Sequence, residues 1–213
     1  MIDRSGVTIR PLGFDDLDAA VAVLSRAFFD DPGAVIVEPD EALRGPAIRQ
    51  LFAPVVRWAI PFGHVSGAFG DHGYMLGVAT FVPPGHDTAS DPELEAAGLD
   101  VAMAAVPAAA DRMIAMTEFL EAQHERGIHG PHWRLGFFGV EPDAQRGGVG
   151  GRLLATGHDA ADLAGERIWL ETFTIENVRF YERRGYRVAI EGVVPGTAYP
   201  LWGLVREPQA PRG

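Results

Sequence analysis

The chain contains no cysteine and no lysine among its 213 residues. The absence of cysteine excludes disulfides and thiolate zinc sites, and it removes the thiol nucleophile that could carry an acyl group. The absence of lysine excludes Schiff-base chemistry. Any acyl transfer by this chain would therefore be direct, or would pass through Ser or Thr.

Basic charge and long apolar runs are also scarce. Lys and Arg number 18 against 29 Asp and Glu, so the formal net charge is −11. A nucleic-acid binder normally shows a basic face, so we expect no such partner. An acidic field favours cationic ligands such as a protonated amine, although surplus carboxylates also simply keep a protein soluble.

No apolar run approaches the ~18 residues of a membrane helix, and the N-terminus lacks a secretory signal, so we expect a cytoplasmic protein with no membrane partner.

The length predicts a single domain over residues 1–207, with a disordered tail at 208–213. Strands and helices interleave along the chain, which indicates a mixed α/β (α+β) sheet. The expected strands are 7–11, 64–69, 74–82, 132–140, 168–173, 186–194 and 201–206. The expected helices are a first one from Asp15 to about Phe28, then 39–58 with a kink or break at Pro46 and Pro54, 92–126 broken near Pro107, 148–164 and 175–184.

The most informative segment is 140–152, VEPDAQRGGVGGR, which is followed by an apolar helical pattern. It is typical of a strand end, a glycine-rich turn and a helix N-terminus. Helix N-termini present unpaired N–H groups and the positive end of the helix dipole to anions. Glycine lets a bulky phosphate approach the backbone closely, and four glycines stand here: Gly147, Gly148, Gly150 and Gly151.

Two familiar phosphate loops do not fit this segment. A dinucleotide fingerprint needs a third glycine where Leu153 stands, and a P-loop needs Gly-Lys-Ser/Thr in a chain without lysine. Gln145, Gly148 and Gly150 satisfy a third pattern, Gln/Arg-x-x-Gly-x-Gly/Ala. This pattern resembles the loop with which GCN5-related N-acetyltransferases (the GNAT superfamily) cradle the pyrophosphate of coenzyme A.

A second motif lies one helix and one strand further on. Leu170-Glu171-Thr172, Asn177 and the run 180–186, FYERRGY, resemble the second acetyl-CoA motif of the same superfamily. The order and spacing of the two motifs are those of the family. The resemblance implies a mixed, mostly antiparallel twisted sheet flanked by helices, with a splayed central strand pair. The overall layout is also similar to the puromycin N-acetyltransferase-like branch.

The resemblance also implies how acetyl-CoA would be held as a co-substrate. Backbone groups around Phe138 and Val140 would bond the pantetheine arm, and Asn177 would bond the cofactor, unless it only caps a helix. Backbone N–H groups of the turn would hold the pyrophosphate. Those N–H groups belong to Gln145, Arg146, Gly147, Gly148, Val149, Gly150, Gly151 and Arg152. The two arginines could add charge-assisted contacts or simply be solvated.

For catalysis, the resemblance makes Tyr181 the general acid that protonates the leaving thiolate, because a phenol is protonated at neutral pH; the alternative is a packing aromatic. Glu141 and Glu171, each near a strand end, are both candidates for the general base, or are solvated rim residues. His129 and His132 are three residues apart, but no third ligand is apparent, so we expect no metal.

The leading hypothesis is acetylation of a primary amine on a small molecule. Two alternatives stay open: acetylation of a protein N-terminus or lysine, and a non-catalytic acyl-CoA-binding regulatory domain. The presence of Tyr181 favours catalysis. We expect a monomer or a homodimer.

Overall fold

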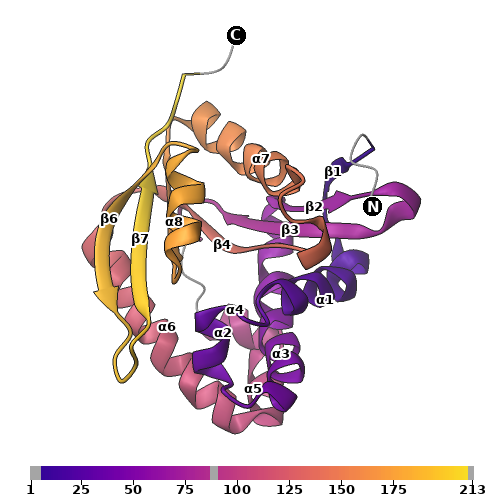
Figure 1. Ribbon diagram of the computed structural model, residues 1–213, viewed down its shortest axis with the longest axis vertical. Coiled ribbons are helices and arrows are strands. Elements are labelled where there is room, and N and C mark those ends of the chain that lie inside the picture. Colours follow the sequence, from indigo (N-terminus) through magenta and orange to yellow (C-terminus); the bar gives the residue numbers. More distant parts are fainter. Residues whose placement is uncertain (1–5, 87–90, 211–213) are drawn as a thin grey trace.

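The computed structural model describes residues 6–86 and 91–210. Within them the strands form one sheet in the order β1-β2-β3-β4-β5-β7-β6 (Figure 1). All neighbours pair antiparallel except β4 and β5, which are parallel. The strands are β1 (Thr8–Pro11), β2 (Val65–Phe69), β3 (Met75–Val82), β4 (His132–Val140), β5 (Arg167–Thr172), β6 (Tyr186–Val193) and β7 (Pro200–Arg206). The mixed α/β, mostly antiparallel architecture is confirmed.

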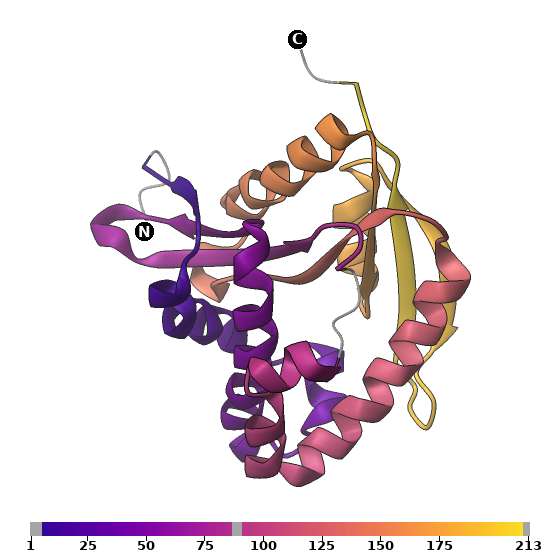
Figure 2. The same ribbon diagram turned by 180° about the vertical axis from the view of Figure 1, so that it is seen from behind.

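Helices cover both faces of this sheet. They are α1 (Leu17–Ala27), α2 (Pro32–Val37), α3 (Glu41–Ala59), α4 (Asp91–Ala96), α5 (Leu99–Ala105), α6 (Pro107–Gly127), α7 (Val149–Ala164) and α8 (Ile175–Glu182). α1 and α3 pack on one face, while α7 and α8 pack on the other (Figures 1 and 2). No helix within the described ranges combines membrane-spanning length with the required hydropathy.

Two local expectations need correction. α3 continues through Pro46 and Pro54 where the sequence predicted a kink or a break, so no break occurs there. A buried face that includes Ile48 and Leu51 holds the helix together, and such packing overrides the low helix propensity of proline. The segment Asp31-Pro32-Gly33 does end the first helical region, but it also begins the short helix α2, which the sequence analysis missed.

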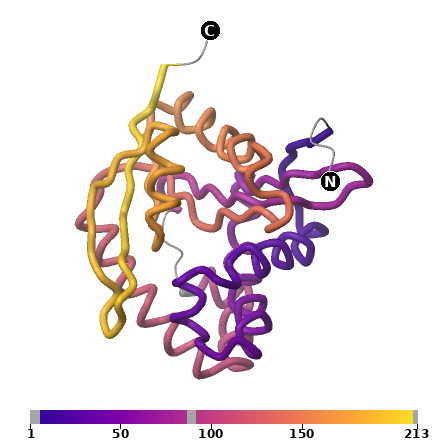
Figure 3. Tube along the Cα trace, viewed as in Figure 1, coloured from indigo at the N-terminus to yellow at the C-terminus, as the bar shows by residue number. Residues whose placement is uncertain are grey.

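The central parallel pair is paired over only part of its length. β4 pairs with β5 at His132, Trp133 and Arg134. Within the described residues, the rest of β4 does not pair with β5. β5 pairs instead with β7 along its length. The two halves of the sheet consequently diverge, as Figure 3 traces along the chain. The splayed strand pair implied by the family resemblance is confirmed.

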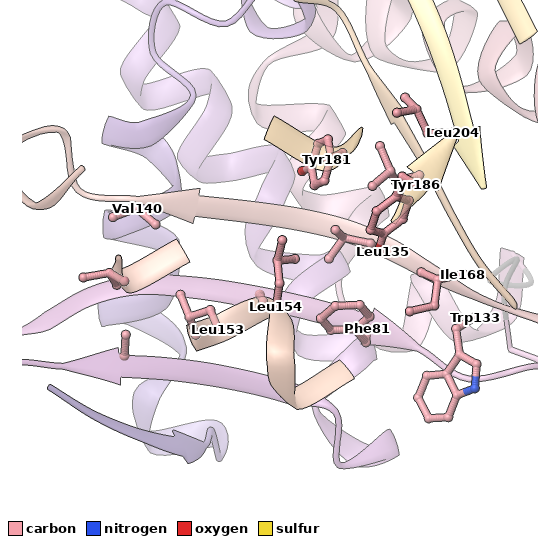
Figure 4. Packing of buried hydrophobic residues seen from close by; sticks show 14 of the residues in the cluster. Phe81, Trp133, Leu135, Val140, Leu153, Leu154, Ile168, Tyr181, Tyr186 and Leu204 are labelled. Atoms are coloured by element: carbon pink, nitrogen blue, oxygen red, sulfur yellow. The ribbon is translucent and has the colours of Figure 1, made fainter. Parts of the chain in front are cut away.

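The main core lies between the sheet and α7. Leu153 and Leu154 of α7 are fully buried, and so are Phe81 of β3 and Ile168 of β5 (Figure 4). A Cβ built on Gly157 would lie 2.4 Å from the ring of Phe81. α7 can therefore lie close to β3 only because this position is glycine.

Candidate active site

A cleft of about 630 Å³ opens where β4 and β5 part. Its walls come from the divergent halves of β4 and β5, from the start of α7, from α8 and from the turn between α1 and α2. Ten of the residues proposed from the sequence line it: Glu171, Tyr181, Phe138, Val140, Gln145, Arg146, Gly148, Gly150, Gly151 and Asn177. The fold therefore brings together two motifs that are separated along the chain by a helix and a strand.

The glycine-rich turn at one end of the cleft leaves backbone N–H groups unpaired. Gly148 is the N-cap of α7 with φ +84°, and no side chain caps the helix. Arg146 also has a positive φ of 60°, which is uncommon for a residue with a Cβ. No acidic side chain occupies the first turn of α7. Open N–H groups together with the helix dipole make this end of the cleft fit an anion.

Three glycines of the turn meet different neighbours. A Cβ on Gly148 would contact nothing within 4 Å, so this position faces open space. A Cβ on Gly150 would lie 2.9 Å from the ring of Phe138 on β4. A Cβ on Gly151 would lie 3.2 Å from a guanidinium nitrogen of Arg184. The turn can accept a bulky group at Gly148, while the other two glycines allow close packing.

The free edge of β4 supplies backbone groups to the same cleft. The N–H of Glu141 donates to the Leu76 carbonyl at 2.8 Å, and the N–H of Phe137 donates to Thr80 Oγ1 at 2.6 Å. Both of these groups point to β3. Because strand N–H and C=O groups alternate in direction, those of Phe138 and Val140 point to the open side, where β5 has diverged.

The remaining residues of the turn have different surroundings. Gln145 Nε2 donates to the Val140 carbonyl at 3.1 Å, which ties the turn to the end of β4. The side chain of Val149 is buried in the core, so only its N–H can serve the site. Arg152 is exposed. Neither Arg152 nor Gly147 is among the described residues that line the cleft.

Two arginines that the sequence analysis did not select border the turn. Arg184 lies over the ring of Phe180 at 3.6 Å, and its Nη1 donates to the Phe180 carbonyl at 2.7 Å. Burial and the adjacent charge of Arg183 lower the pKa of Arg184. Both arginines line the cleft. The signal available in the sequence was the pair of arginines within the motif FYERRGY.

Tyr181 is buried in a group of aromatic rings and also lines the cleft. Its ring centroid lies 5.3 to 6.3 Å from those of Phe138, Phe180 and Tyr186. Figure 4 shows Tyr181 beside Tyr186. Burial raises the pKa of Tyr181, and the negative charge of Asp31 raises it further, whereas Arg184 opposes the shift. The phenol consequently keeps its proton over the physiological pH range.

Asn177 is placed by hydrogen bonds at the start of α8. Its Nδ2 donates to Thr172 Oγ1 at 3.0 Å. The helix N-cap is Thr174, whose hydroxyl accepts from the Asn177 N–H. Asn177 therefore does not cap the helix, and its side chain lies on the cleft wall.

The two glutamates proposed as bases both have cationic partners. Glu141 accepts from Arg26 of α1 through both carboxylate oxygens, with Arg26 Nε 3.0 Å from each, and it is not among the described residues that line the cleft. Glu171 does line the cleft. Its Oε1 accepts from Trp169 Nε1 at 2.6 Å and from Arg134 Nη2 at 3.1 Å.

A third carboxylate, Asp31, was missed by the sequence analysis and lines the cleft. It is the N-cap of α2, and its Oδ1 accepts from the Gly33 N–H at 2.8 Å. Burial raises the pKa of Asp31 to about 6, against the effect of hydrogen bonds from the N–H groups of Gly33 and Ala34. No cation forms an ion pair with it among the described residues. The signal available in the sequence was the Asp-Pro pair, because Asp is a common N-cap and Pro is common at the first helical position.

Arginines of α3 and α6 hold in place the helix that carries this third carboxylate. Buried Arg44 of α3 donates to the carbonyls of Glu38 and Pro39, directly after α2. Arg112 of α6 donates to the Val37 carbonyl at 2.6 Å and pairs with the Glu38 carboxylate at 3.0 Å. α2 is therefore fixed at its C-terminal end, and its N-cap carboxylate is presented to the cleft.

Of the two histidines considered as ligands, His132 has both ring nitrogens engaged, and His129 is bonded through its backbone carbonyl. His132 Nε2 lies 2.6 Å from Nε2 of buried His124, and His132 Nδ1 lies 2.7 Å from the Gly130 carbonyl oxygen. The carbonyl of His129 accepts from Arg167. Among residues 6–86 and 91–210, no group of three or more acidic or histidine side chains could hold a metal ion.

Comparison with known proteins agrees with this architecture. Residues 106–188 match the family model of the acetyltransferase (GNAT) domain. A structure described as histone acetyltransferase HPA2 and related acetyltransferase, from Corynebacterium glutamicum, is 23% identical with a TM-score of 0.59, over 98% of this chain and 99% of that one. Arylalkylamine N-acetyltransferase 2 from Aedes aegypti is 13% identical with a TM-score of 0.64, over 95% and 99%. The polyamine N-acetyltransferase of Drosophila melanogaster, which forms N-acetylagmatine, is 13% identical with a TM-score of 0.57, over 94% and 99%.

The strand order, the divergent parallel pair and the glycine turn at its end define a fold of the GNAT type. The segment that matches the acetyltransferase (GNAT) domain, residues 106–188, contains both motifs from which the sequence predicted this resemblance. The assignment to the puromycin N-acetyltransferase-like branch stays a prediction.

Proposed function

We propose that this protein transfers an acetyl group directly from acetyl-CoA to a primary amine on a small molecule. The observation that carries the proposal is one cleft that joins an anion-binding glycine turn, a protonated phenol at Tyr181 and a carboxylate without a cationic partner at Asp31. Acetyl-CoA is the co-substrate of the GNAT superfamily. No metal takes part in the proposed reaction.

The glycine turn and the β4 edge would hold coenzyme A. The N–H of Gln145 already donates to the Pro142 carbonyl and that of Arg152 to the Gly148 carbonyl, so neither is available to the pyrophosphate. The N–H groups from Arg146 to Gly151 converge on the pyrophosphate, and the Arg146 side chain adds charge-assisted contacts. The outward N–H and C=O groups of Phe138 and Val140 bond the pantetheine arm and orient the thioester. Asn177 contributes its amide oxygen, because its amide nitrogen already donates to Thr172.

Asp31 is the best placed general base. A base must be ionised and free to accept a proton near the operating pH. The pKa of Asp31 is about 6, whereas Glu171 is paired with Arg134, and Glu141 is paired with Arg26 outside the described cleft lining. Ionised Asp31 would attract the protonated amine and take its proton, either directly or through water. Glu171 and Glu141 remain alternative bases.

The neutral amine then attacks the thioester carbonyl carbon. A C–N bond forms, the C–S bond breaks, and the departing sulfur needs a proton. Tyr181 supplies it, since its phenol is protonated and lies on the same cleft wall. Tyr181 regains a proton from solvent, and the proton on Asp31 is also released there.

Phe173, in the turn between β5 and α8, gives the cleft lining an apolar side chain. It packs in an apolar cluster with residues of α2, α6 and the β6–β7 hairpin. The Aedes and Drosophila structures belong to enzymes named for small amines. A protein N-terminus or lysine is the second candidate acceptor, since the Corynebacterium structure is named for a histone acetyltransferase. A cytoplasmic location and a monomeric or homodimeric state belong to the proposal as well.

The proposal is tested by measuring free thiol release from acetyl-CoA with a panel of small amines and peptides. Turnover with small amines and not with peptides supports it. Turnover with peptides alone would show that the acceptor is a protein amine and not a small molecule. Binding of acetyl-CoA without turnover on any acceptor would favour a regulatory acyl-CoA-binding role.

A further inference from the structure

A second hollow of about 840 Å³ adjoins the cleft on the other side of the glycine turn. The two share Gly151, Arg183 and Arg184 as lining residues. Beyond these residues the hollow follows one face of α7, through Ala155 and Asp159. It is therefore continuous with the cleft at the turn and leads away from Tyr181.

The free positive charge of this hollow lies at the end that meets the turn. Arg184 is held by Phe180, and neither Arg183 nor Arg184 forms an ion pair with a carboxylate among the described residues. Arg206, further along, is neutralised by Asp162, which accepts from both of its terminal nitrogens at 2.7 Å. Two unneutralised guanidinium groups in a chain of net charge −11 mark a site for an anion.

Coenzyme A carries a phosphate that the glycine turn does not use. Its pantetheine arm and its 3′-phosphoadenosine leave the pyrophosphate in opposite directions. If the pyrophosphate lies on the turn and the pantetheine arm runs along β4 to Tyr181, then the adenosine must leave on the side where the second hollow opens. The exposed carboxylate of Asp159 would repel a phosphate further along α7 and keep it near the arginines.

We propose that Arg183 and Arg184 bind the 3′-phosphate of coenzyme A, so that the enzyme distinguishes coenzyme A from 3′-dephospho-coenzyme A. This inference rests on the proposed acetyl-CoA function. It assigns a specificity role to a pair of residues and a ligand-binding role to the second hollow.

The test compares dissociation constants of coenzyme A and 3′-dephospho-coenzyme A by titration calorimetry. We expect the wild-type protein to bind coenzyme A about tenfold or more tightly, since charge-assisted hydrogen bonds are the stronger class. Arg183→Gln and Arg184→Gln should each weaken binding of coenzyme A and leave binding of the dephospho form nearly unchanged. The Arg183 side chain makes no hydrogen bond to α8 within the described structure, and its backbone bond to the Arg179 carbonyl is kept in the variant, so Arg183→Gln keeps the test valid if Arg184→Gln unfolds.

Arg187→Gln is the matched control, because Arg187 is exposed on β6, pairs with Glu207 and lies outside the lining of both hollows as described. It should bind both ligands like the wild type. Equal affinity of the wild type for both ligands would overturn the inference and leave the proposed function intact. An equal loss of both affinities in the arginine variants would also overturn it, since the arginines would then bind the pyrophosphate. Failure of the wild type to bind either ligand would contradict the proposed function itself.

Discussion

Asp31 at the start of α2 and Tyr181 in α8 line the same cleft, and the charge of the Asp31 carboxylate helps to raise the pKa of the Tyr181 phenol. The two residues are 150 positions apart in a chain of 213 residues. One group titrates near neutrality and the other stays protonated. Environments that move the pKa values of two groups apart in this way are suited to acid–base catalysis.

Asp31→Asn should lower kcat/KM for amine acetylation by about 10²–10⁴-fold, the usual contribution of a general base. Because the pKa of Asp31 is about 6, wild-type kcat/KM should fall as the pH drops below about 6, and the variant should lack this limb. Asp30→Asn is the matched control, since Asp30 is exposed and is not among the described cleft-lining residues. A pH profile that is unchanged in Asp31→Asn would return the role to Glu171 or Glu141.

The same carboxylate should make folding stability depend on pH. The folded-state pKa of Asp31, about 6, exceeds the 3.8 of an unperturbed aspartate, so protonation of this carboxyl favours the folded state. The resulting stabilisation is fully present below pH 3.8 and is lost as the pH rises through 6. Asn can still act as an N-cap, so Asp31→Asn should remove this dependence. Urea unfolding at pH 4.5 and 7.5 should show the wild type losing about 2 kcal/mol relative to the variant; parallel behaviour of the two proteins would contradict the assignment.

Gly148→Glu should abolish binding of acetyl-CoA, because it puts a negative charge where the pyrophosphate must lie. The position has open space around it but a φ of +84°, which a residue with a Cβ adopts only with strain. Gly165→Glu is a matched control at the other end of α7, with φ +67° and nothing within 4 Å of its Cβ. Calorimetry should show binding by the control and none by Gly148→Glu. Wild-type affinity in folded Gly148→Glu would show that the phosphate site is misassigned.

Tyr181→Phe should lower kcat by about 10²–10⁴-fold and leave the affinity for acetyl-CoA unchanged, because the proton is needed only as the thiolate leaves. The ring contacts with Phe138 and Tyr186 are retained, so stability should change little. The loss should shrink for an acyl donor with a more acidic leaving thiol. Wild-type kcat in the variant would reduce Tyr181 to a packing residue.

Acetyl transfer should be direct, because the chain has no cysteine to carry an acyl group. Double-reciprocal initial-rate plots with both substrates varied should therefore intersect. Intact-protein mass spectrometry before addition of the amine should show no acetylated enzyme. Parallel plots, or a gain of one acetyl group in mass, would indicate a covalent intermediate on Ser or Thr.

Local sequence determined the elements and motifs that depend on neighbouring residues. The glycine turn before α7 and the hairpin of β2 and β3 follow from glycine conformation and from strand patterning, and both stand where the sequence predicted them. The two family motifs, whose residues stand at fixed spacing, also predicted the resemblance to the acetyltransferase (GNAT) domain that residues 106–188 match. These features require no knowledge of distant contacts.

Tertiary structure alone decided which ionisable groups are available for chemistry. Glu141 and Glu171 are ordinary strand-end carboxylates in sequence, but Arg26 and Arg134 reach them from α1 and from earlier in β4. Asp31 has the sequence of a helix boundary, and only the packing around α2 buries it beside the cleft. A carboxylate's pKa and partners depend on burial and on charges that arrive from other elements. The sequence by itself therefore determined the strands, the helices and the glycine turn, whereas the folded chain decided which carboxylate lies in the cleft without a cationic partner among the described residues.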